Sequence, residues 1–309
     1  MPRHPRIPAE LHDRVFTSAQ ASEHGVTSSM LRGPAFVAVH HGVWRLTTTE
    51  LTFELAVRAA ALALPPGSAA SHVTALQWMG VMIGSPSPVH FSTTSTAQTR
   101  NDVVLHRRLG RTSPLSRNGV AVLGPDRSFV DSGTLLSVRS LVQAGDWLVR
   151  AGHTTVDRLI DYTMASHLDG VIRAHEAALL VRERVDSPRE SDARLLIATA
   201  GLPEPEPNID ITTEAGEWLA RGDLVLPAYR IVVEHDGWVH ERNAEQRQKD
   251  HLRRERIEAA GWTLIVVTIA DFEQPTSIVA RIVEALLRRG YTGPPPELGR
   301  KWHQIARDL

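Results

Sequence analysis

The stretch GDLVLPAYRIVVEHDGWVH, residues 222–240, holds two short apolar segments separated by a proline turn. The first segment follows Asp223, and the second ends at Glu234. Apolar runs of this length on either side of a turn predict two paired strands. Because side chains of a strand alternate between its faces, Glu234 and Asp236 are expected on one face and His235 on the other.

Residues on both sides of this stretch extend the two strands into a larger α/β unit. Ser187 is a helix N-cap, Pro188 stands at the first helical position, and Gly201 closes that helix. The expected elements are a helix at 187–200, a hairpin with strands at 209–213 and 218–220, the two strands above, a helix at 243–260, a strand at 263–268 and a helix within 271–289. The expected order is helix, three antiparallel strands, helix, strand and helix.

Three carboxylates of this unit are expected near one edge of its sheet. Asp223 begins the strand that pairs with the strand ending in Glu234 and Asp236. Carboxylates this close repel each other unless one is protonated or a cation lies among them. Oxygen ligands suit Mg²⁺ or Mn²⁺, and such an ion can activate water and stabilise charge on a phosphate. The sequence therefore predicts a divalent-metal site at Asp223 and Glu234.

Several short motifs follow one another through residues 187–289. They are an S-P-x-E helix start (Ser187, Pro188, Glu190), a GLP connector (Gly201–Pro203), a strand Asp (Asp223), an E-x-D-G turn (Glu234, Asp236, Gly237), a nearby His (His240), a K-D-x-x-R helix (Lys249, Asp250, Arg253) and a G-W strand start (Gly261, Trp262). This set resembles the PD-(D/E)XK nuclease superfamily, in particular the uncharacterised bacterial domains akin to the very-short-patch (Vsr-like) repair endonuclease. The resemblance covers about a third of the chain. It implies a restriction-endonuclease-like αβββαβα core.

The resemblance also implies a role for each matched acidic residue. Asp223 is expected to be the central metal ligand and Glu234 the second, with the backbone carbonyl of His235 as a further ligand. Glu190 is expected to reach the site from the first helix, directly or through water. Asp236 stands where the superfamily usually has a lysine, so the cation that orients the attacking water is missing.

Basic and imidazole side chains complete the implied site. His240 is expected to act as general acid or base, because imidazole titrates near neutral pH. Asp250 is expected to orient His240, and Lys249 and Arg253 to contact DNA. His240, Lys249 or a second metal ion are the candidates to replace the missing lysine.

Most of these roles have a simpler alternative. The alternatives are a helix-capping role for Glu190, a strand-ending turn for Asp236 and Gly237, a surface position for His240, and a solvated ion pair for Asp250. Asp223 and Glu234 are harder to explain in this way. An acid that ends an apolar strand is costly to bury without a partner.

The first 50 residues predict a winged helix-turn-helix. Three short helices are expected near residues 11–16, 19–23 and 26–32, and FVAVHHGVWRL (36–46) indicates a hairpin. In this arrangement the side chains expected to face DNA are Ser28, Ser29, Arg32 and Arg45. The alternative is a surface that docks another protein. The region loosely resembles the winged helix of AbiEi-type antitoxins.

Residues 51–186 predict a mixed α+β middle domain between the winged helix (1–50) and the nuclease-like unit (187–309). Helices are expected at 49–64 and 68–80, strands at 90–92, 103–106 and 120–122, and further helices from 129 to 181. No catalytic spacing is recognisable in this segment. Its histidines (His72, His90, His106 and His153) are scattered along the sequence, which favours structural or surface roles.

Composition limits the class of protein. The chain has 309 residues, of which 42% are hydrophobic and 22% charged, and its formal net charge is −1. Length and composition indicate a globular protein of two or three domains. The balanced charge gives no nucleic-acid signal of its own and does not exclude DNA binding, because local patches matter more than totals. The elements expected above make the whole chain a multidomain α/β protein. The absence of cysteine excludes disulfides and thiolate metal sites. No apolar run has the length of a membrane helix and no signal-peptide core is present, so a cytoplasmic protein without a membrane partner is expected.

The function that these features favour is a Mg²⁺-dependent (or Mn²⁺-dependent) DNA endonuclease in repair or defence. The main alternative is a non-enzymatic DNA-binding regulator of toxin–antitoxin type whose nuclease domain is degenerate, which the missing lysine favours. A third possibility is a structural partner in a defence or repair complex. The sequence leaves the oligomeric state and the form of the nucleic acid open.

Overall fold

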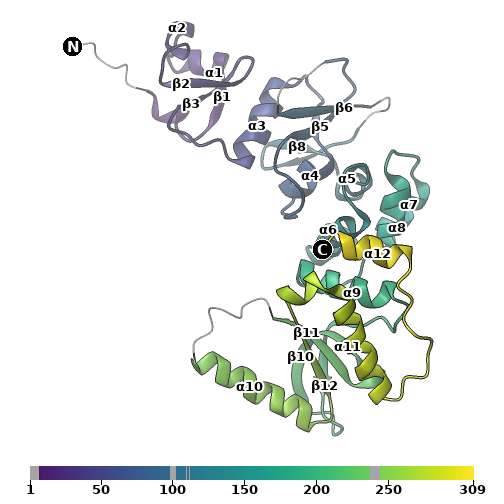
Figure 1. The fold of residues 1–309 in the computed structure, drawn as a ribbon. Coiled ribbons are helices and arrows are strands. Elements are labelled where there is room, and N and C mark those ends of the chain that lie inside the picture. Colours follow the sequence, from purple (N-terminus) through teal and green to yellow (C-terminus); the bar gives the residue numbers. More distant parts are fainter. Residues whose placement is uncertain (1–6, 98–101, 109, 111, 237–243) are drawn as a thin grey trace. The chain divides into compact units, whose positions relative to one another are not determined.

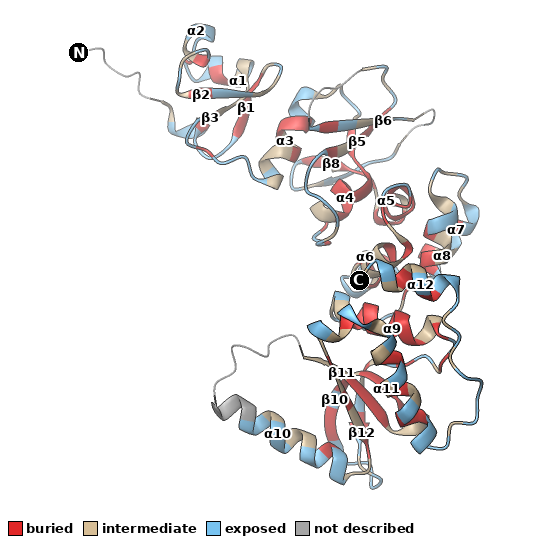
Figure 2. Ribbon diagram, viewed as in Figure 1, coloured by how far each residue is buried: buried red, intermediate tan, exposed pale blue. Residues whose placement is uncertain are grey.

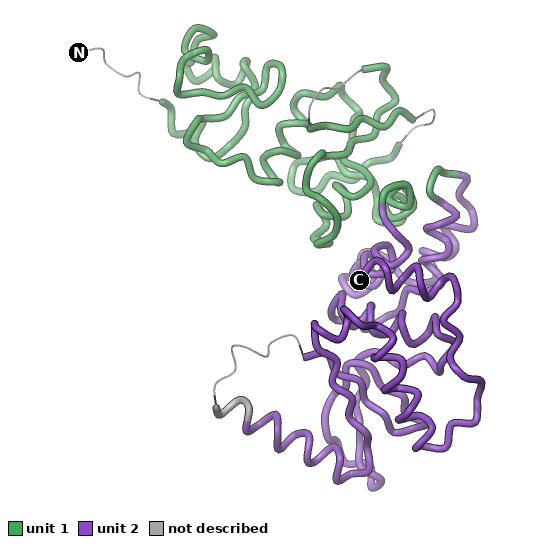
Figure 3. Tube along the Cα trace, in the orientation of Figure 1, with its two compact units in different colours: residues 1–135, 168–170 green, residues 136–167, 171–309 purple. Residues whose placement is uncertain are grey.

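The computed structural model describes residues 7–97, 102–108, 110, 112–236 and 244–309 (Figure 1). The chain is mixed α/β, with three sheets in these described ranges. It divides into two compact units, which Figure 3 colours separately: unit 1 is residues 1–135 with 168–170, and unit 2 is residues 136–167 with 171–309. The main division therefore lies within residues 51–186, inside the segment expected to be one middle domain.

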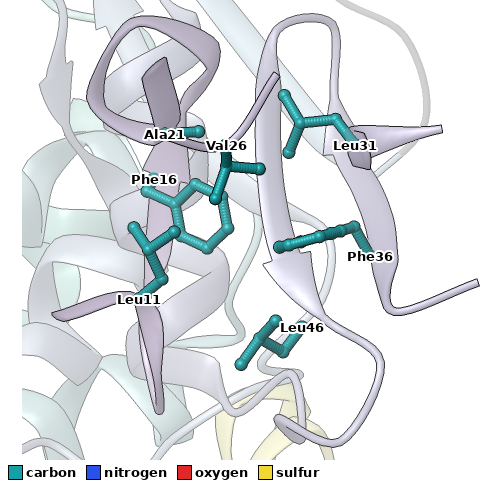
Figure 4. Packing of buried hydrophobic residues seen from close by; sticks show 7 residues of the cluster. All are labelled: Leu11, Phe16, Ala21, Val26, Leu31, Phe36 and Leu46. Atoms are coloured by element: carbon teal, nitrogen blue, oxygen red, sulfur yellow. The ribbon is translucent and has the colours of Figure 1, made fainter. Parts of the chain in front are cut away.

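The first part of unit 1 is a three-stranded antiparallel sheet with short helices. The strands lie in the order β1 (Val15–Thr17), β3 (Val43–Leu46), β2 (Phe36–His40). The helices are η1 (Ala9–Leu11), α1 (Ser18–Glu23) and α2 (Ser28–Leu31). Figure 4 shows their shared core, which consists of Leu11, Phe16, Ala21, Val26, Leu31, Phe36 and Leu46.

The helix expected across residues 11–16 is wrong in its second half. Val15 and Phe16 belong to strand β1, which pairs with β3. Both side chains are buried, Phe16 in the core with Phe36 and Val15 in a second cluster with Val43. Three apolar residues are too few to distinguish a helix from a strand whose two faces are both covered.

The second part of unit 1 is a five-stranded sheet of mixed direction. Its strand order is β6 (Val103–Arg107), β5 (Val89–Thr93), β4 (Ala69–Ala70), β8 (Val120–Val122), β7 (Leu115–Arg117). The helices of this part are α3 (Phe53–Ala63), α4 (His72–Trp78) and α5 (Pro125–Ser132). β5 and β6 are parallel, and their register pairs His90 with Val104 and Ser92 with His106.

Unit 2 contains a four-stranded sheet in the order β12 (Thr263–Thr268), β11 (Ile231–Asp236), β10 (Trp218–Leu226), β9 (Glu206–Thr212). β9, β10 and β11 are antiparallel, whereas β11 and β12 are parallel. Together with α9 (Pro188–Thr199), α10 (Ala244–Ala259) and α11 (Pro275–Arg288), they follow the element order expected from the sequence.

Helices cover both faces of this sheet. α10 packs on β10 and β12, and its Ile257 shares a buried cluster with Val225 and Val232. α11 packs on β12 and on α9, and it lies on the opposite side of the sheet from α10 (Figure 1). Figure 2 shows that α10 is exposed along much of its length, whereas the strands beneath it are buried.

α9 is held by buried charges as well as by apolar contacts. Its Arg194 is fully buried and forms an ion pair with Asp146 of α6 (Val138–Arg150) at 3.2 Å. Ser191 donates to the same carboxylate at 2.6 Å. Burial raises the pKa of Asp146, and the Arg194 guanidinium opposes that rise. The remaining helices of unit 2 are α7 (Val156–Ala165), α8 (Val171–Ala178) and α12 (Arg300–Arg307).

No helix among the described residues is long and apolar enough to span a bilayer.

Candidate functional site

Asp223 lies on β10, directly after a glycine that the packing requires. A Cβ atom on Gly222 would come within 2.8 Å of methyl groups of Val225 and Val232. Glycine therefore lets β10 approach β11 closely at this point. The Asp223 carboxylate crosses to β11, where its Oδ2 accepts a hydrogen bond from the backbone N–H of His235 at 3.0 Å.

Glu234 lies on the same face of the sheet, on the neighbouring strand. Its register partner on β12 is Val266, and it is one position beyond the last paired residues of β10 and β11. Only 15% of its side chain is exposed. Arg253 of α10 forks onto the carboxylate, with N–O distances of 2.6 and 2.9 Å. A second bond from Arg253, to the carbonyl of Arg221 at 3.0 Å, fixes the guanidinium.

These groups line a polar cleft of about 200 Å³ on the α10 face of the sheet. Its walls are Asp223, Glu234, His235, Asp236, Asp250, Arg253, Arg254 and Val266. Asp223, Glu234 and Asp236, which the sequence predicts to converge, all line this one cleft. Alternation along β11 explains the result, because Val232, Glu234 and Asp236 share the face that α10 covers.

The protonation of Asp223 reflects its surroundings. Burial raises its pKa to about 6, although the hydrogen bond from the His235 N–H lowers it. The negative charges of Glu190 and Glu234 raise the pKa further, and Arg253 lowers it. A carboxyl group in this state gains from a cation, because a nearby positive charge favours the ionised form.

Glu190 is close enough to influence Asp223, but its carboxylate is engaged elsewhere. It is buried near the start of α9, where its backbone N–H donates to Ser187 as expected of an N-cap. Its Oε2 accepts from the backbone N–H of Asp186 at 2.9 Å and from the Asn208 amide at 2.6 Å. Glu190 is not among the residues that line the cleft. The structure therefore favours the capping alternative over direct ligation.

Asn208 is a residue that the sequence prediction missed. It is buried on β9 in a left-handed conformation, with φ of 51°. Its amide also donates to the carbonyl of Arg184 at 2.8 Å, so that it ties β9 to the start of α9. Asparagine tolerates a left-handed backbone better than most residues. Its presence within a strand is therefore the signal by which the sequence could have pointed to this position.

His235 points away from the acidic face, as strand alternation predicts. Its ring packs against Phe272 with a centroid distance of 5.8 Å. Burial and the nearby Arg189 lower its pKa, whereas Asp223 and Asp236 raise it. Only its backbone, which already binds Asp223, belongs to the acidic side of the sheet.

Of the remaining residues of unit 2 that were predicted to belong to the site, some line the cleft and others do not. Asp250 lies with Asp236 in the cleft lining, and Lys249 is exposed on the same helix outside that lining. His240 lies outside the described residues. The ion pair between Arg253 and Glu234 was not foreseen, because Arg253 was predicted to contact DNA. Arginine and glutamate 19 positions apart give no local pattern that predicts a pair.

The cleft offers two carboxylates, rather than three, to a divalent ion. Within the described parts of the chain, no three His, Asp or Glu side chains lie close enough together to hold a metal. Mg²⁺ in proteins is often held by one or two carboxylates, with water as the other ligands. Asp223 and Glu234, whose oxygens are hard donors, fit that arrangement if Arg253 shares or releases Glu234.

The residues predicted to face DNA in unit 1 differ in whether their side chains are exposed or already bonded within the protein. Ser28, Ser29 and Arg32 are exposed on and just after α2, which is a helix of only four residues. Arg45 instead donates from Nη1 to the backbone carbonyls of Leu46 and Thr49. Arg45 therefore stabilises the segment after β3, which is a structural role that the sequence did not indicate.

Comparison with known proteins gives little further information. No family model matches the chain. Two uncharacterized proteins of Mycobacterium tuberculosis, Rv2248 of strain H37Rv and MT2308 of strain CDC 1551 / Oshkosh, are each 29% identical to it over 125 residues. The match covers 40% of this chain and 46% of each relative, so the chain spans less than half the length of the curated relatives that it matches.

Proposed function

We propose that unit 2 is a divalent-metal-dependent endonuclease of restriction-endonuclease-like type, with DNA as its substrate. The observation that carries the proposal is the shared cleft in which Asp223 and Glu234 meet from adjoining antiparallel strands. Burial raises the pKa of Asp223, and the charge of Glu234 adds to that rise, so a cation between these carboxylates would favour their ionised forms.

Basic side chains beside the carboxylates support a phosphate-bearing substrate. Arg253 and Arg254 of α10 line the same cleft. Guanidinium groups bind phosphate oxygens through paired N–H donors, whereas a site that only holds a cation has no need of them. A phosphodiester could therefore lie between the acidic strand ends and α10.

The residues of the chain would divide the work as follows. Asp223 and Glu234 would hold the metal, which when bound supplies a more acidic water and stabilises charge on the phosphate. As the metal binds, the Arg253 side chain would turn from Glu234 to the phosphate. Glu234 would then be paired with the metal, and Arg253 with the phosphate. Asp236 and Asp250 line the cleft, and either of them would accept a proton from water.

Cleavage assays test this proposal directly. Plasmid, linear, branched and single-stranded DNA are incubated with the full chain in Mg²⁺, Mn²⁺ or chelator. We expect metal-dependent cleavage that Asp223→Asn and Glu234→Gln each reduce by about 10²-fold or more. Glu206→Gln, which alters an exposed carboxylate of β9 in the same sheet, is the matched control and is expected to retain activity. Cleavage that persists unchanged in both site variants would overturn the assignment.

A non-enzymatic DNA-binding regulator is the second candidate function. The ion pair from Arg253 already neutralises Glu234 without a metal, and an aspartate stands at position 236, where nucleases of the PD-(D/E)XK superfamily usually have a lysine. In unit 1, the sheet β1–β3–β2 with α1 and α2 is compatible with a winged helix that presents Ser28, Ser29 and Arg32. Metal-independent gel shifts that Arg32→Gln weakens, together with no cleavage of any DNA form, would favour this function.

A further inference from the structure

Three histidines that are far apart in the sequence meet in unit 1. His72 begins α4, His90 lies on β5, and His106 lies on β6. The rings of His72 and His106 stack with centroids 3.6 Å apart, and His90 Nδ1 lies 3.0 Å from His106 Nε2. His72 is almost fully buried and has a left-handed backbone with φ of 54°. A residue other than glycine adopts that conformation at a cost, which its surroundings must offset.

Two arginines and one aspartate adjoin the stacked rings. Arg108 Nη2 lies 3.3 Å from His72 Nε2 and 2.9 Å from Asp131 Oδ1. Arg127 reaches the other oxygen of Asp131 at 2.9 Å. Because arginine can only donate, His72 Nε2 is the acceptor, and the Nδ1–H of the neutral ring donates to Ser71 Oγ at 2.8 Å. This arrangement argues against Ser71 as a nucleophile activated by His72.

The charge of the cluster depends on its imidazoles. Burial lowers the pKa of all three, to about 2 for His72 and about 4 for His106, so they are neutral at pH 7. Both guanidiniums pair with Asp131, whose pKa burial raises and the two arginines lower, and Asp169 is a second negative charge near Asp131. Each imidazole adds a positive charge to this group when it is protonated.

Two buried donors in the cluster have no hydrogen-bond partner among the described residues. They are the Arg108 Nε and the hydroxyl of Ser92, which is fully buried. Ser92 pairs with His106 in the register of β5 and β6, and it lies two residues from His90. Its side chain is therefore on the same face of the sheet as both imidazoles. Buried polar atoms normally have partners, so unpaired ones call for an explanation.

We propose that His90, His106, Arg108 and Arg127 bind a doubly charged oxyanion of the phosphate class at the solvent-facing rim of this cluster. The two guanidiniums repel a divalent cation, and they are suited to bind an oxyanion through paired donors. The rim is open to a ligand, because Arg108 and Arg127 are 15% and 22% exposed and both rim histidines are only partly buried. A bound dianion offsets the charge of a protonated imidazole and accepts from the unpaired donors.

Calorimetric titration of the full chain with sodium sulfate and with inorganic phosphate, at ionic strength held constant with NaCl, tests the proposal. Sulfate stays a dianion throughout the range, so its pH dependence reports on the protein. We expect saturable binding of both anions. Sulfate affinity should rise as the pH falls from 7 towards the pKa of about 4 of His106, by at most about tenfold per pH unit when one proton is taken up with the anion.

Two variants and two controls locate the site. Arg127→Gln is expected to weaken sulfate binding by about tenfold or more, because it removes a charged donor. Arg107→Gln is the matched control: it removes an exposed arginine of β6 that alternation places on the opposite face from His106. Arg253→Gln, which removes the cleft arginine of unit 2, is the second control: loss of the saturable sulfate binding in this variant would place the anion in the unit 2 cleft and overturn the proposal.

Arg127→Gln leaves Asp131 with one arginine and can disturb folding, so His106→Asn provides an independent test. This variant keeps both arginine–aspartate pairs and is expected to bind sulfate more weakly, with a flatter pH dependence. Near-UV circular dichroism verifies that each variant is folded. The absence of saturable sulfate binding in the wild type would overturn the proposal. Equal weakening by Arg107→Gln and His106→Asn would also overturn it.

Discussion

Replacement of Asp223 by asparagine should stabilise unit 2 at neutral pH. Burial raises the pKa of this carboxyl from its ordinary value of 3.8 to about 6, so the folded chain binds a proton that the unfolded chain has lost between these values. Stability therefore falls as the pH rises from about 4 to about 6, and it stays lower above that range. Asparagine is nearly isosteric and carries no charge to desolvate.

The size of the effect follows from the same values. A rise from 3.8 to about 6 corresponds to about 3 kcal/mol, at about 1.4 kcal/mol for each pH unit. Asp223 is only partly buried, and solvent screening reduces the cost of its charge. We therefore expect Asp223→Asn to add roughly 1 to 1.5 kcal/mol at pH 7.5 and close to nothing at pH 4.

Urea unfolding of both proteins at pH 4 and pH 7.5 measures this difference. Trp262 and Trp302 are buried in unit 2, so tryptophan fluorescence reports on its unfolding. Asp210→Asn, which changes an exposed carboxylate of β9, is the control and should show no such pH dependence. A destabilised Asp223→Asn variant at pH 7.5, or an equal effect at both pH values, would refute the reasoning.

Three other substitutions test separate parts of unit 2. Gly222→Ala should lower the urea midpoint by the equivalent of about 1–3 kcal/mol, because the added methyl group has no room between β10 and β11. Arg194→Met should lower the free energy of unfolding by about 3 kcal/mol in the same assay, because it leaves the buried carboxylate of Asp146 without its counter-ion. An unchanged midpoint would show that the ion pair contributes nothing to stability. Arg253→Gln should strengthen Mn²⁺ binding in a calorimetric titration, because it frees Glu234; weaker binding would mean that the arginine helps to form the site.

The sheet of unit 2 was predictable because its pattern is local. Alternation places Glu234 and Asp236 on one face, and the proline turn between the apolar segments brings Asp223 alongside them. β11 begins with three buried apolar residues, and β12 is apolar between its terminal threonines, as expected of strands whose two faces are both covered. The face on which each of these residues lies follows from strand geometry, so it can be predicted from the sequence alone.

Contacts between distant segments were not predictable in the same way. The sequence shows His72, His90 and His106 as scattered residues, and only the pairing of β5 with β6 and the packing of α4 bring them together. The bond from Arg253 to Glu234 likewise depends on how α10 crosses the sheet. The helix prediction at Val15 and Phe16 was wrong for a different reason, because the spacing of three apolar residues (Leu11, Val15 and Phe16) is too short a pattern to distinguish a helix from a strand.

Anomalous scattering from a crystal soaked in Mn²⁺ is the most direct test of the metal site in unit 2. We predict a difference peak in the cleft, within coordinating distance of carboxylate oxygens of both Asp223 and Glu234, at about 2.1–2.2 Å. Diffraction data from the Asp223→Asn variant should lack this peak. A well-ordered cleft without manganese in the wild type, with Arg253 still forked onto Glu234, would contradict the account.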